Sequence, residues 1–326
     1  MNTKGRAMPD RVEPLTNIIP FVDLQPHSFS QSCITVGNFD GVHRGHQAII
    51  SDVVTAGKEK GRPVLVITFF PNPVEFFGGA KRPFYLTTPA EKEAILLGLG
   101  VDKVITFQFD REFADLLPET FLSALKEKLG LGTLMVGYDF ALGKDRQGTV
   151  PVIKAMGKEM GFSVEVIDAI RFAGEEISST RIRQALDEGD VRLAQTMLGR
   201  PYTVAGEVTH GSDRGSRIGI PTANLAHWPL KMLPAVGVYA TRPTVLGKTY
   251  LGVTNVGYRP TFEDQDKPNI ETHILDFDGN IYGEQLELQF IKKIRDEHKF
   301  NGVDALIAQI ERDKATARRF FSHDET

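Results

Sequence analysis

Short apolar runs alternate with helical patterns in the first half of the chain, and no other feature restricts the possible folds so strongly. Residues 64–70 form a continuous series of β-branched and aromatic side chains, which is typical of a strand covered on both faces. Strands that alternate with helices over short connections form a mostly parallel sheet with right-handed crossovers. The sequence therefore predicts an α/β domain. Its expected strands are residues 34–36, 64–70, 103–107, 133–136 and 163–167, and its expected helices are residues 47–60, 89–99, 119–129 and 152–160.

The pattern changes near residue 199, after a helical stretch at residues 191–198. Short, mostly alternating runs then follow one another without helices, which predicts an antiparallel sheet, most simply a small barrel. Residues 303–314 place apolar side chains on one face and predict a packing helix. We therefore expect an N-terminal extension at residues 1–30, an α/β domain at 31–198 and a barrel domain at 199–326. The expected barrel strands are residues 202–208, 237–240, 250–256, 270–277 and 286–290.

Composition restricts the partners of the chain. The net charge of -4 argues against a nucleic-acid coat or a role at a membrane surface. The N-terminal residues have no continuous apolar segment, so neither a signal peptide nor a spanning helix is expected. The single cysteine, Cys33, cannot form an internal disulfide and is expected to be a small buried residue. We expect a cytoplasmic protein with no nucleic-acid or membrane partner, and the sequence leaves its oligomeric state open.

The turn at residues 36–47 joins the first expected strand to the first helix. The N-terminus of a helix attracts anions, because its N–H groups are unpaired and its dipole is positive there. His43 and His46 are three residues apart, which places both imidazoles on one side, and Gly45 leaves the approach between them open. We interpret the turn as a triphosphate site. The alternatives are two structural histidines or two metal ligands, although zinc-binding helices normally space them four apart beside a glutamate.

Three further loops follow expected strands of the same sheet, at residues 71–73, 137–140 and 177–183. Ligands of such sheets bind outside the carboxyl ends of the strands, so all four loops are expected to converge on one crevice. In the last loop, serine and threonine residues cap a helix, and Arg183 returns along the same face to meet an anion. A Ser-Ser-Thr sequence is most often only a helix cap, and its position beside the histidine turn favours the functional interpretation.

The barrel region carries a second group of candidate residues. Residues 211–219 form a glycine-rich, basic turn that is able to bring backbone N–H groups against phosphate. In an extended segment Thr222 and Asn224 point the same way, and their oxygens suit a Mg²⁺ ion that keeps several waters and nucleotide phosphates. Glu271 lies on an otherwise apolar strand. It is either an outward-facing residue or a base that accepts a proton from a substrate hydroxyl during phosphoryl transfer.

From Ile34 to Asp313 the chain resembles the bacterial bifunctional riboflavin kinase/FMN adenylyltransferases, also called FAD synthetases. One His-x-Gly-His sequence is weak evidence, but six motifs in the order of the family are hard to obtain by chance. The resemblance implies a Rossmann-like nucleotidyltransferase domain followed by a six-stranded, riboflavin kinase-like barrel with a C-terminal helix. The motifs are residues 37–46, 137–143, 177–183, 198–202, 221–224 and 294–300.

The resemblance also implies two reactions. The barrel would phosphorylate riboflavin to FMN with ATP and Mg²⁺, and the first domain would join FMN to the adenylyl group of a second ATP, giving FAD and pyrophosphate. Glu271 would be the kinase base, and Thr222 and Asn224 would bind the metal. The implied ATP contacts in the barrel are Gly211, Arg214, Gly219 and Thr222. Those in the first reaction are Gly37, Phe39, Asp40, His43, Gly45, His46, Asp139, Ser179, Thr180 and Arg183, with His43, His46 and Arg183 stabilising the leaving pyrophosphate.

The implied flavin contacts are Pro71, Pro73 and Arg295. The chain departs from the family pattern at Ala141-Leu142, where a basic-aromatic pair is usual, and at Asn72, where a histidine often precedes the second proline. The expected effect is on the details of flavin binding.

Two rival interpretations of the whole chain are a nucleotidyltransferase with one activity and a flavin-binding regulator without turnover. The first would not need the residues 221–224 motif or Glu271, and the second would be expected to have lost a catalytic residue.

Overall fold

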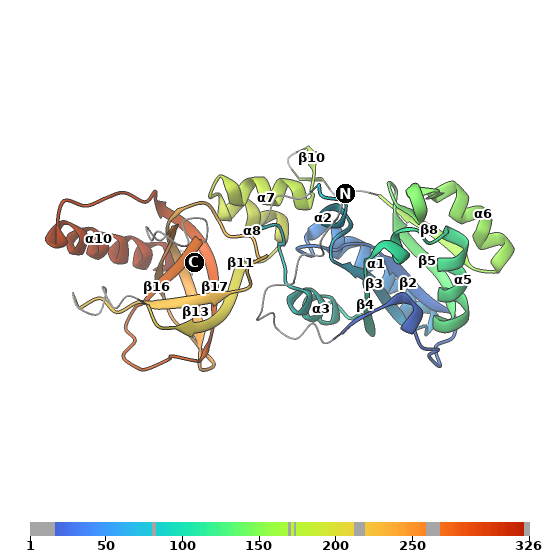
Figure 1. Cartoon of the computed structure of the whole chain (residues 1–326), viewed down its shortest axis with the longest axis horizontal. Coiled ribbons are helices and arrows are strands. Elements are labelled where there is room, and N and C mark those ends of the chain that lie inside the picture. Colours follow the sequence, from blue (N-terminus) through green and yellow to red (C-terminus); the bar gives the residue numbers. More distant parts are fainter. Residues whose placement is uncertain are drawn as a thin grey trace, which may run out of the picture. The chain divides into compact units, whose positions relative to one another are not determined.

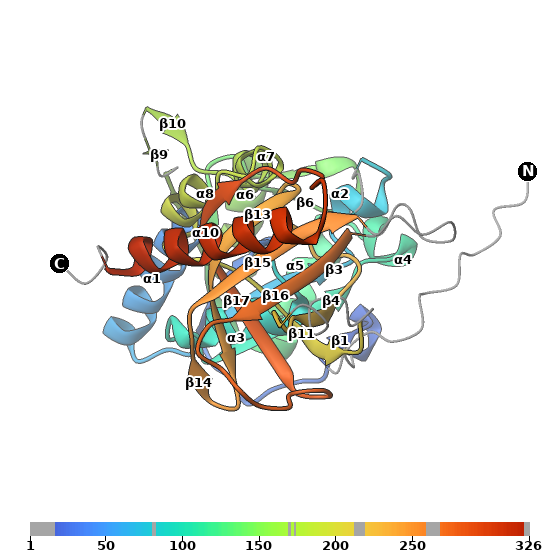
Figure 2. The same ribbon diagram turned by 90° about the vertical axis from the view of Figure 1, so that its left-hand side faces the viewer.

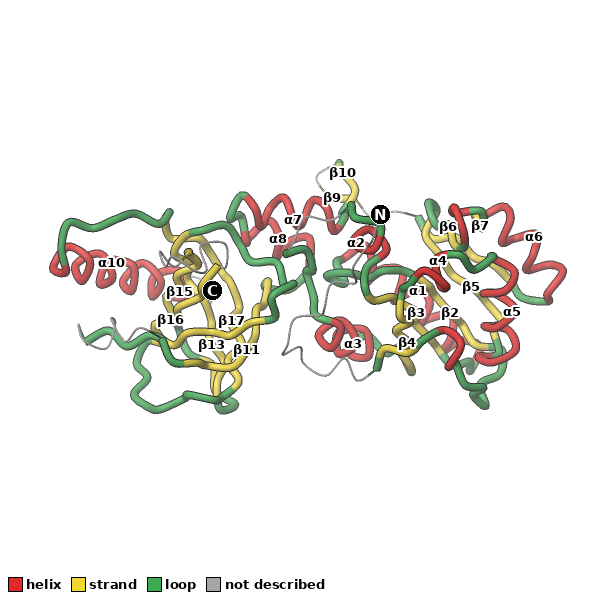
Figure 3. Tube along the Cα trace, viewed as in Figure 1, coloured by secondary structure: helices red, strands yellow, loops and turns green. Residues whose placement is uncertain are grey.

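The computed structural model describes residues 17–79, 83–168, 171–172, 174–211, 219–258 and 268–322 (Figure 1). Contacts divide the chain into two units, Met1–Lys81 with Thr87–Ile177, and Arg82–Leu86 with Ser178–Thr326. Helices alternate with strands in the first unit, and strands predominate in the second (Figure 3). The contacts thus place residues 178–198 with the second unit, whereas the domain boundary after residue 198 stays a prediction.

The first unit is built on a parallel sheet, as the alternating pattern predicts. Its strand order is β1-β4-β3-β2-β5-β8. The central strand β2 pairs with β3 on one side and β5 on the other, both in parallel. The connections therefore reverse direction beside β2, and ligands of such sheets bind at that point. The strands are β1 (Ile18–Ile19), β2 (Ser32–Val36), β3 (Val64–Phe70), β4 (Lys103–Gln108), β5 (Leu131–Gly137) and β8 (Ser163–Ile167).

Helices cover both faces of this sheet. In β3, Val64 and Val66 pack in one apolar core with residues of α1 and α3, whereas Leu65 and Ile67 pack in the other with residues of α5 and α6. This confirms the interpretation of residues 64–70 as a doubly covered strand. Cys33 is fully buried, as expected, and burial raises the pKa of its thiol. The helices are α1 (Arg44–Lys60), α2 (Pro73–Phe76), α3 (Pro89–Gly98), α4 (Arg111–Ala114), α5 (Pro118–Leu129) and α6 (Val150–Met160).

Short elements complete this unit. The edge strand β1, which the sequence did not predict, pairs with β4 and lies within the expected N-terminal extension. The remaining pieces are the 3-10 turns η1 (Phe21–Asp23) and η2 (Lys144–Arg146) and the two-residue strands β6 (Ala141–Leu142), β7 (Gly148–Thr149), β9 (Arg171–Phe172) and β10 (Glu175–Glu176). Nowhere in the described part of the chain is a helix long and apolar enough to span a bilayer.

The second unit contains a closed antiparallel barrel. Its sheet order is β14-β13-β15-β16-β12-β11-β17, and an additional β13–β17 pairing closes six strands into a ring, with β14 as a hairpin extension of β13. The expected six-stranded barrel is thus confirmed. The elements are α7 (Ser179–Asp187), α8 (Val191–Leu198), β11 (Tyr202–Thr209), β12 (Ala223–His227), β13 (Gly237–Val245), β14 (Lys248–Thr249), β15 (Gly252–Tyr258), β16 (Pro268–Ile274), β17 (Gln285–Arg295) and α10 (Val303–Ser322).

The two faces of the barrel strands differ in chemistry. On the inside, the fully buried hydroxyls of Thr241, Thr254 and Thr272 form a ladder with oxygen separations of 2.8 and 2.9 Å. On the outside, apolar residues of β13 and β15 pack against Ala317 and Phe321 of α10, which runs across these strands (Figure 2). Side chains alternate between the two faces along each strand. Neighbours of the threonines in sequence therefore lie on the outer face.

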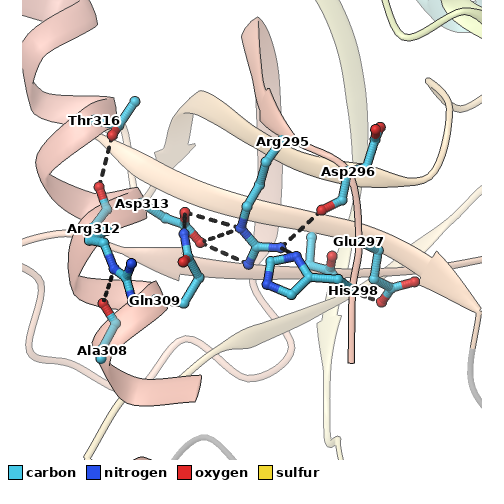
Figure 4. Close-up of polar contacts among 10 residues, drawn as sticks. Arg295, Asp296, Glu297, His298, Ala308, Gln309, Arg312, Asp313 and Thr316 are labelled. Atoms are coloured by element: carbon cyan, nitrogen blue, oxygen red, sulfur yellow. Dashed lines mark hydrogen bonds and ion pairs between the residues drawn. The ribbon is translucent and has the colours of Figure 1, made fainter. Parts of the chain in front are cut away.

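A buried ion pair fastens α10 to the end of β17. The Nε of Arg295 lies 3.1 and 3.0 Å from the two carboxylate oxygens of Asp313, and a terminal nitrogen lies 2.9 Å from one of them (Figure 4). The other terminal nitrogen donates to the carbonyl oxygen of Asp296 at 3.0 Å and lies 3.2 Å from His298 Nδ1. Asp313 is 2 % exposed. The Arg295 side chain thus joins β17, the following turn and α10.

Asp313→Asn is expected to destabilise the second unit by about 3 kcal/mol, because it leaves the Arg295 charge partly buried and without its counterion. Urea unfolding followed by the fluorescence of Trp228, the only tryptophan, measures this unit. Asp276→Asn is the matched control: it removes the carboxylate from an exposed pair with Arg318 and is expected to change little. Equal midpoints for the two variants would contradict a stabilising role of the buried pair.

Candidate active sites

The histidine turn lies between β2 and α1. His43 is the N-cap of α1, and its Nδ1 accepts a hydrogen bond from the backbone N–H of His46 at 3.3 Å. The two imidazole rings stack with their centroids 3.6 Å apart and an angle of 18° between their planes. The rings thus lie side by side, as their spacing predicts. The helix begins at Arg44, three residues before the expected start at Gln47.

Close backbone packing shapes this turn. A Cβ atom on Gly45 would lie 3.1 Å from the ring of His43 and 3.5 Å from the carbonyl oxygen of Ile177. The Phe39 ring packs against His46 edge to face, with centroids 5.2 Å apart. Phe39 and Val42 have φ values of 48° and 38°, which side chains rarely adopt. Such strained backbone concentrates at functional sites, which fits a turn shaped for a ligand.

His46 is held neutral near pH 7. Burial lowers its pKa well below the usual value, and the neighbouring His43 and Lys92 lower it further. Its Nδ1 is buried and has no hydrogen-bond partner among the described residues. Two stacked imidazoles are difficult to protonate together, because like charges repel at this distance. The ring of His46 thus offers a neutral N–H donor at the start of α1.

Lys92, which no sequence pattern singles out, contacts the histidine turn through the carbonyl oxygen of Asn38. It lies on α3, 7 % exposed, and its Nζ donates to Thr68 Oγ1 at 2.8 Å. Burial lowers its pKa to about 8, and the carboxylate of Asp40 opposes that shift. Between two glutamates in sequence, this lysine resembles an ordinary surface charge. The available signal was its spacing from Leu96: residues four apart share a helix face, and Leu96 is a core residue.

Two further loops of the first unit follow strands that neighbour β2. Pro71 and Pro73 come directly after β3, and Asn72 between them caps α2 by accepting from the N–H of Val74 at 2.9 Å. Asp139 follows β5 and is exposed, and its carbonyl oxygen accepts from Arg146 at 3.1 Å. The strands are parallel, so these loops leave the same edge of the sheet as the histidine turn. Their contacts with ATP and flavin stay predictions.

The Ser-Ser-Thr loop opens α7. Ser178 is the N-cap, and its hydroxyl accepts from the N–H of Arg181 at 3.3 Å, which confirms the expected cap. Arg183 places its guanidinium 3.7 Å from the centre of the Phe84 ring, and its Nε donates to the Phe84 carbonyl oxygen at 2.9 Å. Ser179, Thr180 and Arg183 belong to the second unit. Their approach to the two histidines stays a prediction.

The second candidate site lies on the outer face of the barrel. Asn224 of β12 and Glu271 of β16 are directly opposite each other in the antiparallel register, so their side chains leave the same face. Glu271 Oε1 accepts from Asn269 Nδ2 at 2.7 Å. His273 lies two residues after Glu271, and its Nδ1 is 2.8 Å from the carbonyl oxygen of Pro221. This contact positions the segment that carries Thr222.

Gly211 approaches this face closely. A Cβ atom there would overlap the carboxamide of Asn224, so only glycine allows this contact. Gly219 has a φ of 76°, in the left-handed region that favours glycine. Arg214, expected to contact ATP, lies in the segment 212–218, outside the described residues. Arg295, expected to contact flavin, uses its guanidinium on Asp313, Asp296 and His298, and its contact with a flavin stays a prediction.

The residues around Asn224 and Glu271 fit a magnesium ion. Within the described ranges, no three His, Cys, Asp or Glu side chains are grouped so that they could hold a metal by themselves. Thr222, Asn224 and Glu271 supply a hydroxyl, a carboxamide and a carboxylate oxygen. Mg²⁺ prefers such oxygen ligands and commonly binds through only one or two protein groups, completed by water and substrate phosphates.

Comparison with known proteins agrees with this architecture. The FAD synthetase family model matches residues 25–181, and the riboflavin kinase family model matches residues 198–321. The bifunctional riboflavin kinase/FMN adenylyltransferase of Escherichia coli K12 is 41% identical over 304 residues, covering 90% of this chain and 96% of that protein. The Bacillus subtilis protein of the same name is 38% identical over 299 residues, covering 90% of this chain and 94% of that protein.

A solved structure shares the fold over nearly the whole chain. It is a crystal structure from Streptococcus pneumoniae, described as a macrolide-efflux protein, with a TM-score of 0.83 and 31% identity. The similarity covers 93% of this chain and 99% of that one. The two family models match the chain in series, in the order of its two folds, and the relatives are similar over nearly their full length. The chain therefore belongs to the family of bifunctional riboflavin kinase/FMN adenylyltransferases.

Proposed function

We propose that the two reactions of this family are carried out at the two sites described above. The barrel phosphorylates riboflavin with ATP to give FMN and ADP. The first unit then joins FMN to the adenylyl group of a second ATP, which gives FAD and releases pyrophosphate. The observation that carries the kinase assignment is the direct pairing of Asn224 with Glu271 across β12 and β16. The observation that carries the adenylyl-transfer assignment is the stacked pair of His43 and His46 at the start of α1.

In the kinase reaction Glu271 acts as the base. Its carboxylate accepts the proton of the terminal ribityl hydroxyl as that oxygen attacks the γ-phosphorus of ATP, and ADP leaves. Asn269 orients the carboxylate through the 2.7 Å hydrogen bond to Oε1. Thr222 and Asn224 would hold Mg²⁺, which would supply positive charge beside the nucleotide phosphates. Gly211 and Gly219 allow the backbone on either side of the segment 212–218 to approach the nucleotide.

In the adenylyl transfer the nucleophile, the phosphate of FMN, is already an anion. It attacks the α-phosphorus of ATP, pyrophosphate leaves, and no covalent intermediate with the protein is needed. The protein therefore contributes position and charge stabilisation. The neutral ring of His46 donates a hydrogen bond to the triphosphate, and the N–H groups at the start of α1 face the same anion. Ser179, Thr180 and Arg183 complete the phosphate contacts in this proposal.

We propose that the chain is cytoplasmic. We also propose that the boundary between its two catalytic domains lies near residue 198. The single cysteine is buried and unpaired, which fits a reducing compartment. The riboflavin kinase family model begins at residue 198, which supports that boundary.

Incubation of the purified protein with riboflavin, ATP and Mg²⁺ tests the proposal. Chromatography is expected to show FMN first and FAD later, because the second reaction consumes the product of the first. Supplied FMN is expected to give FAD without riboflavin, and chelation of Mg²⁺ is expected to stop both reactions. Riboflavin that stays unchanged would reject the kinase assignment, and FMN that accumulates without FAD would reject the adenylyl transfer.

A further inference from the structure

Lys92 is buried although lysine is rarely buried without partners. Its ammonium nitrogen lies 2.8 Å from Thr68 Oγ1, 3.1 Å from the carbonyl oxygen of Asn38 and 3.4 Å from the carbonyl oxygen of Phe69. An ammonium group carries three donors and no acceptor. These three oxygens therefore match the full donor capacity of Lys92.

The three acceptors lie at the carboxyl ends of two neighbouring strands. Thr68 and Phe69 are near the end of β3, and Asn38 follows the end of β2. The Thr68 hydroxyl itself donates to the Asn38 carbonyl oxygen at 3.0 Å, so these two groups and the ammonium form a closed triangle. Lys92 thus joins the end of β3 to the end of β2, the strand beside which the connections reverse and ligands of such sheets bind.

Thr87, the residue before the N-cap of α3, contacts residues 40 and 41 of the histidine turn. Thr87 Oγ1 accepts from the N–H of Gly41 at 3.1 Å, and the Thr87 N–H donates to Asp40 Oδ1 at 3.2 Å. Asp40 is also buried. Thr87 thus contacts residues 40 and 41, and Lys92, five residues later, contacts residue 38. Hydrogen bonds from the start of α3 therefore hold residues 38, 40 and 41 of the histidine turn in place.

A purely structural link between the two strand ends would not need the charge of Lys92. Removing an ammonium from water is unfavourable unless an opposite charge or several acceptors compensate it. A neutral donor would tie the strand ends together without this cost. The buried charge also lowers the pKa of His46, together with His43 and burial itself. A positive group behind a turn that receives a triphosphate also attracts the bound anion, in addition to the nearby Asp40 carboxylate.

We infer that Lys92 is a positioning residue for the adenylyl transfer: it holds the turn at residues 38–41 in the shape that accepts the ATP triphosphate and keeps a positive charge behind it. This inference rests on the proposed function of the first unit. Lys92 acts through the turn and through His46, and it does not itself touch the reacting phosphorus.

Lys92→Met removes both the hydrogen bonds and the charge. It is expected to lower kcat/KM for ATP in FMN adenylylation by about 100-fold, since misplaced phosphate-binding groups cost rate steeply. Riboflavin phosphorylation by the same chain is expected to stay within about twofold, because additivity holds for independent sites. Thr68→Val is the matched control. It removes one acceptor and keeps the charge, and it is expected to lower kcat/KM by on the order of 10-fold or less.

NMR titration of the His46 ring separates position from charge without using activity. Its midpoint is expected to rise in Lys92→Met, because a positive neighbour is lost, and to stay unchanged in Thr68→Val; His46→Gln assigns the signal. Besides Lys92, the charged or titratable group that acts on His46 is His43. Asp40 acts indirectly, because it stabilises the charge of Lys92. An unmoved midpoint in Lys92→Met, or adenylyl transfer within twofold of wild type, overturns the inference.

Lys92→Arg covers the case in which Lys92→Met does not fold. It keeps the charge but cannot place three donors in the same pocket, so the His46 midpoint stays and adenylyl transfer falls. Wild-type transfer in Lys92→Arg overturns the inference on position. A wild-type chain that never converts FMN to FAD rejects the proposed function instead, and the two failures are therefore distinguishable.

Discussion

Glu271→Gln is expected to lower riboflavin phosphorylation by about 100-fold or more, because a carboxamide cannot accept the proton of the attacking hydroxyl. The substitution keeps the shape of the side chain and an oxygen that accepts from Asn269 Nδ2, as Glu271 does at 2.7 Å. Binding of riboflavin and ATP is therefore expected to change little, so that the loss falls on kcat. Steady-state kinetics with riboflavin as the varied substrate separates kcat from KM.

The same chain supplies the internal control for this variant. FMN adenylylation by Glu271→Gln is expected to equal that of wild type, because the reaction is assigned to the first unit. Glu287→Gln is a matched control for the substitution itself, since Glu287 is an exposed residue of barrel strand β17. Wild-type phosphorylation in Glu271→Gln would remove Glu271 from the role of base and return it to an outward-facing residue.

The architecture was predictable because it depends on periodic patterns. The run at residues 64–70 is apolar on both faces, and the structure places alternate residues of β3 in separate cores, as such a run predicts. In the barrel, β12 was seen only as an extended segment, because Asn224 and His227 give it little strand character. Its pairing with β11 and β16 is set by tertiary contacts rather than by local propensity.

The candidate sites were predictable only in part. His43 and His46 are candidates because their spacing along one turn is local information, and the same holds for Thr222 and Asn224 along one extended segment. Glu271 is a candidate because it is a carboxylate on an otherwise apolar strand. The direct opposition of Asn224 and Glu271 depends on the register of β12 with β16, which the sequence does not display. Lys92 was missed for the same reason: its three acceptors lie on β3 and beyond β2.

Arg295 illustrates the opposite case. The motif at residues 294–300 suggests a flavin contact for it, which stays a prediction, and the structure shows how its side chain is held. Its partner Asp313 is separated from it by a turn and half of a helix, and only folding brings the two together. A sequence motif thus marks a residue as important without distinguishing a ligand contact from a structural ion pair.

His46→Ala is expected to have the reverse effect of Glu271→Gln: adenylyl transfer falls by about 100-fold or more, and riboflavin phosphorylation is retained. The loss arises because a donor that stabilises the charge on the leaving pyrophosphate has been removed. His43 keeps its own place at the start of α1, where its Nδ1 accepts from the N–H of residue 46, so the donor lost from residue 46 is not replaced at its position. The measurement is the rate of FAD formation from supplied FMN and ATP, with FMN formation from riboflavin assayed in the same preparation.

His46→Gln distinguishes the loss of the donor from the loss of packing. Glutamine keeps an N–H donor and part of the contact with the His43 ring, so its transfer rate is expected to lie between those of His46→Ala and wild type. Neutral His46 is the form that the fold favours, since its pKa is lowered. The wild-type protein therefore gains stability from this residue above pH 6.5, the ordinary pKa of histidine, and loses it as the pH falls toward the lower pKa of the folded state. Parallel loss of both activities in a His46→Ala chain that keeps the wild-type circular dichroism spectrum would reject two separate sites, since such a result requires a shared site.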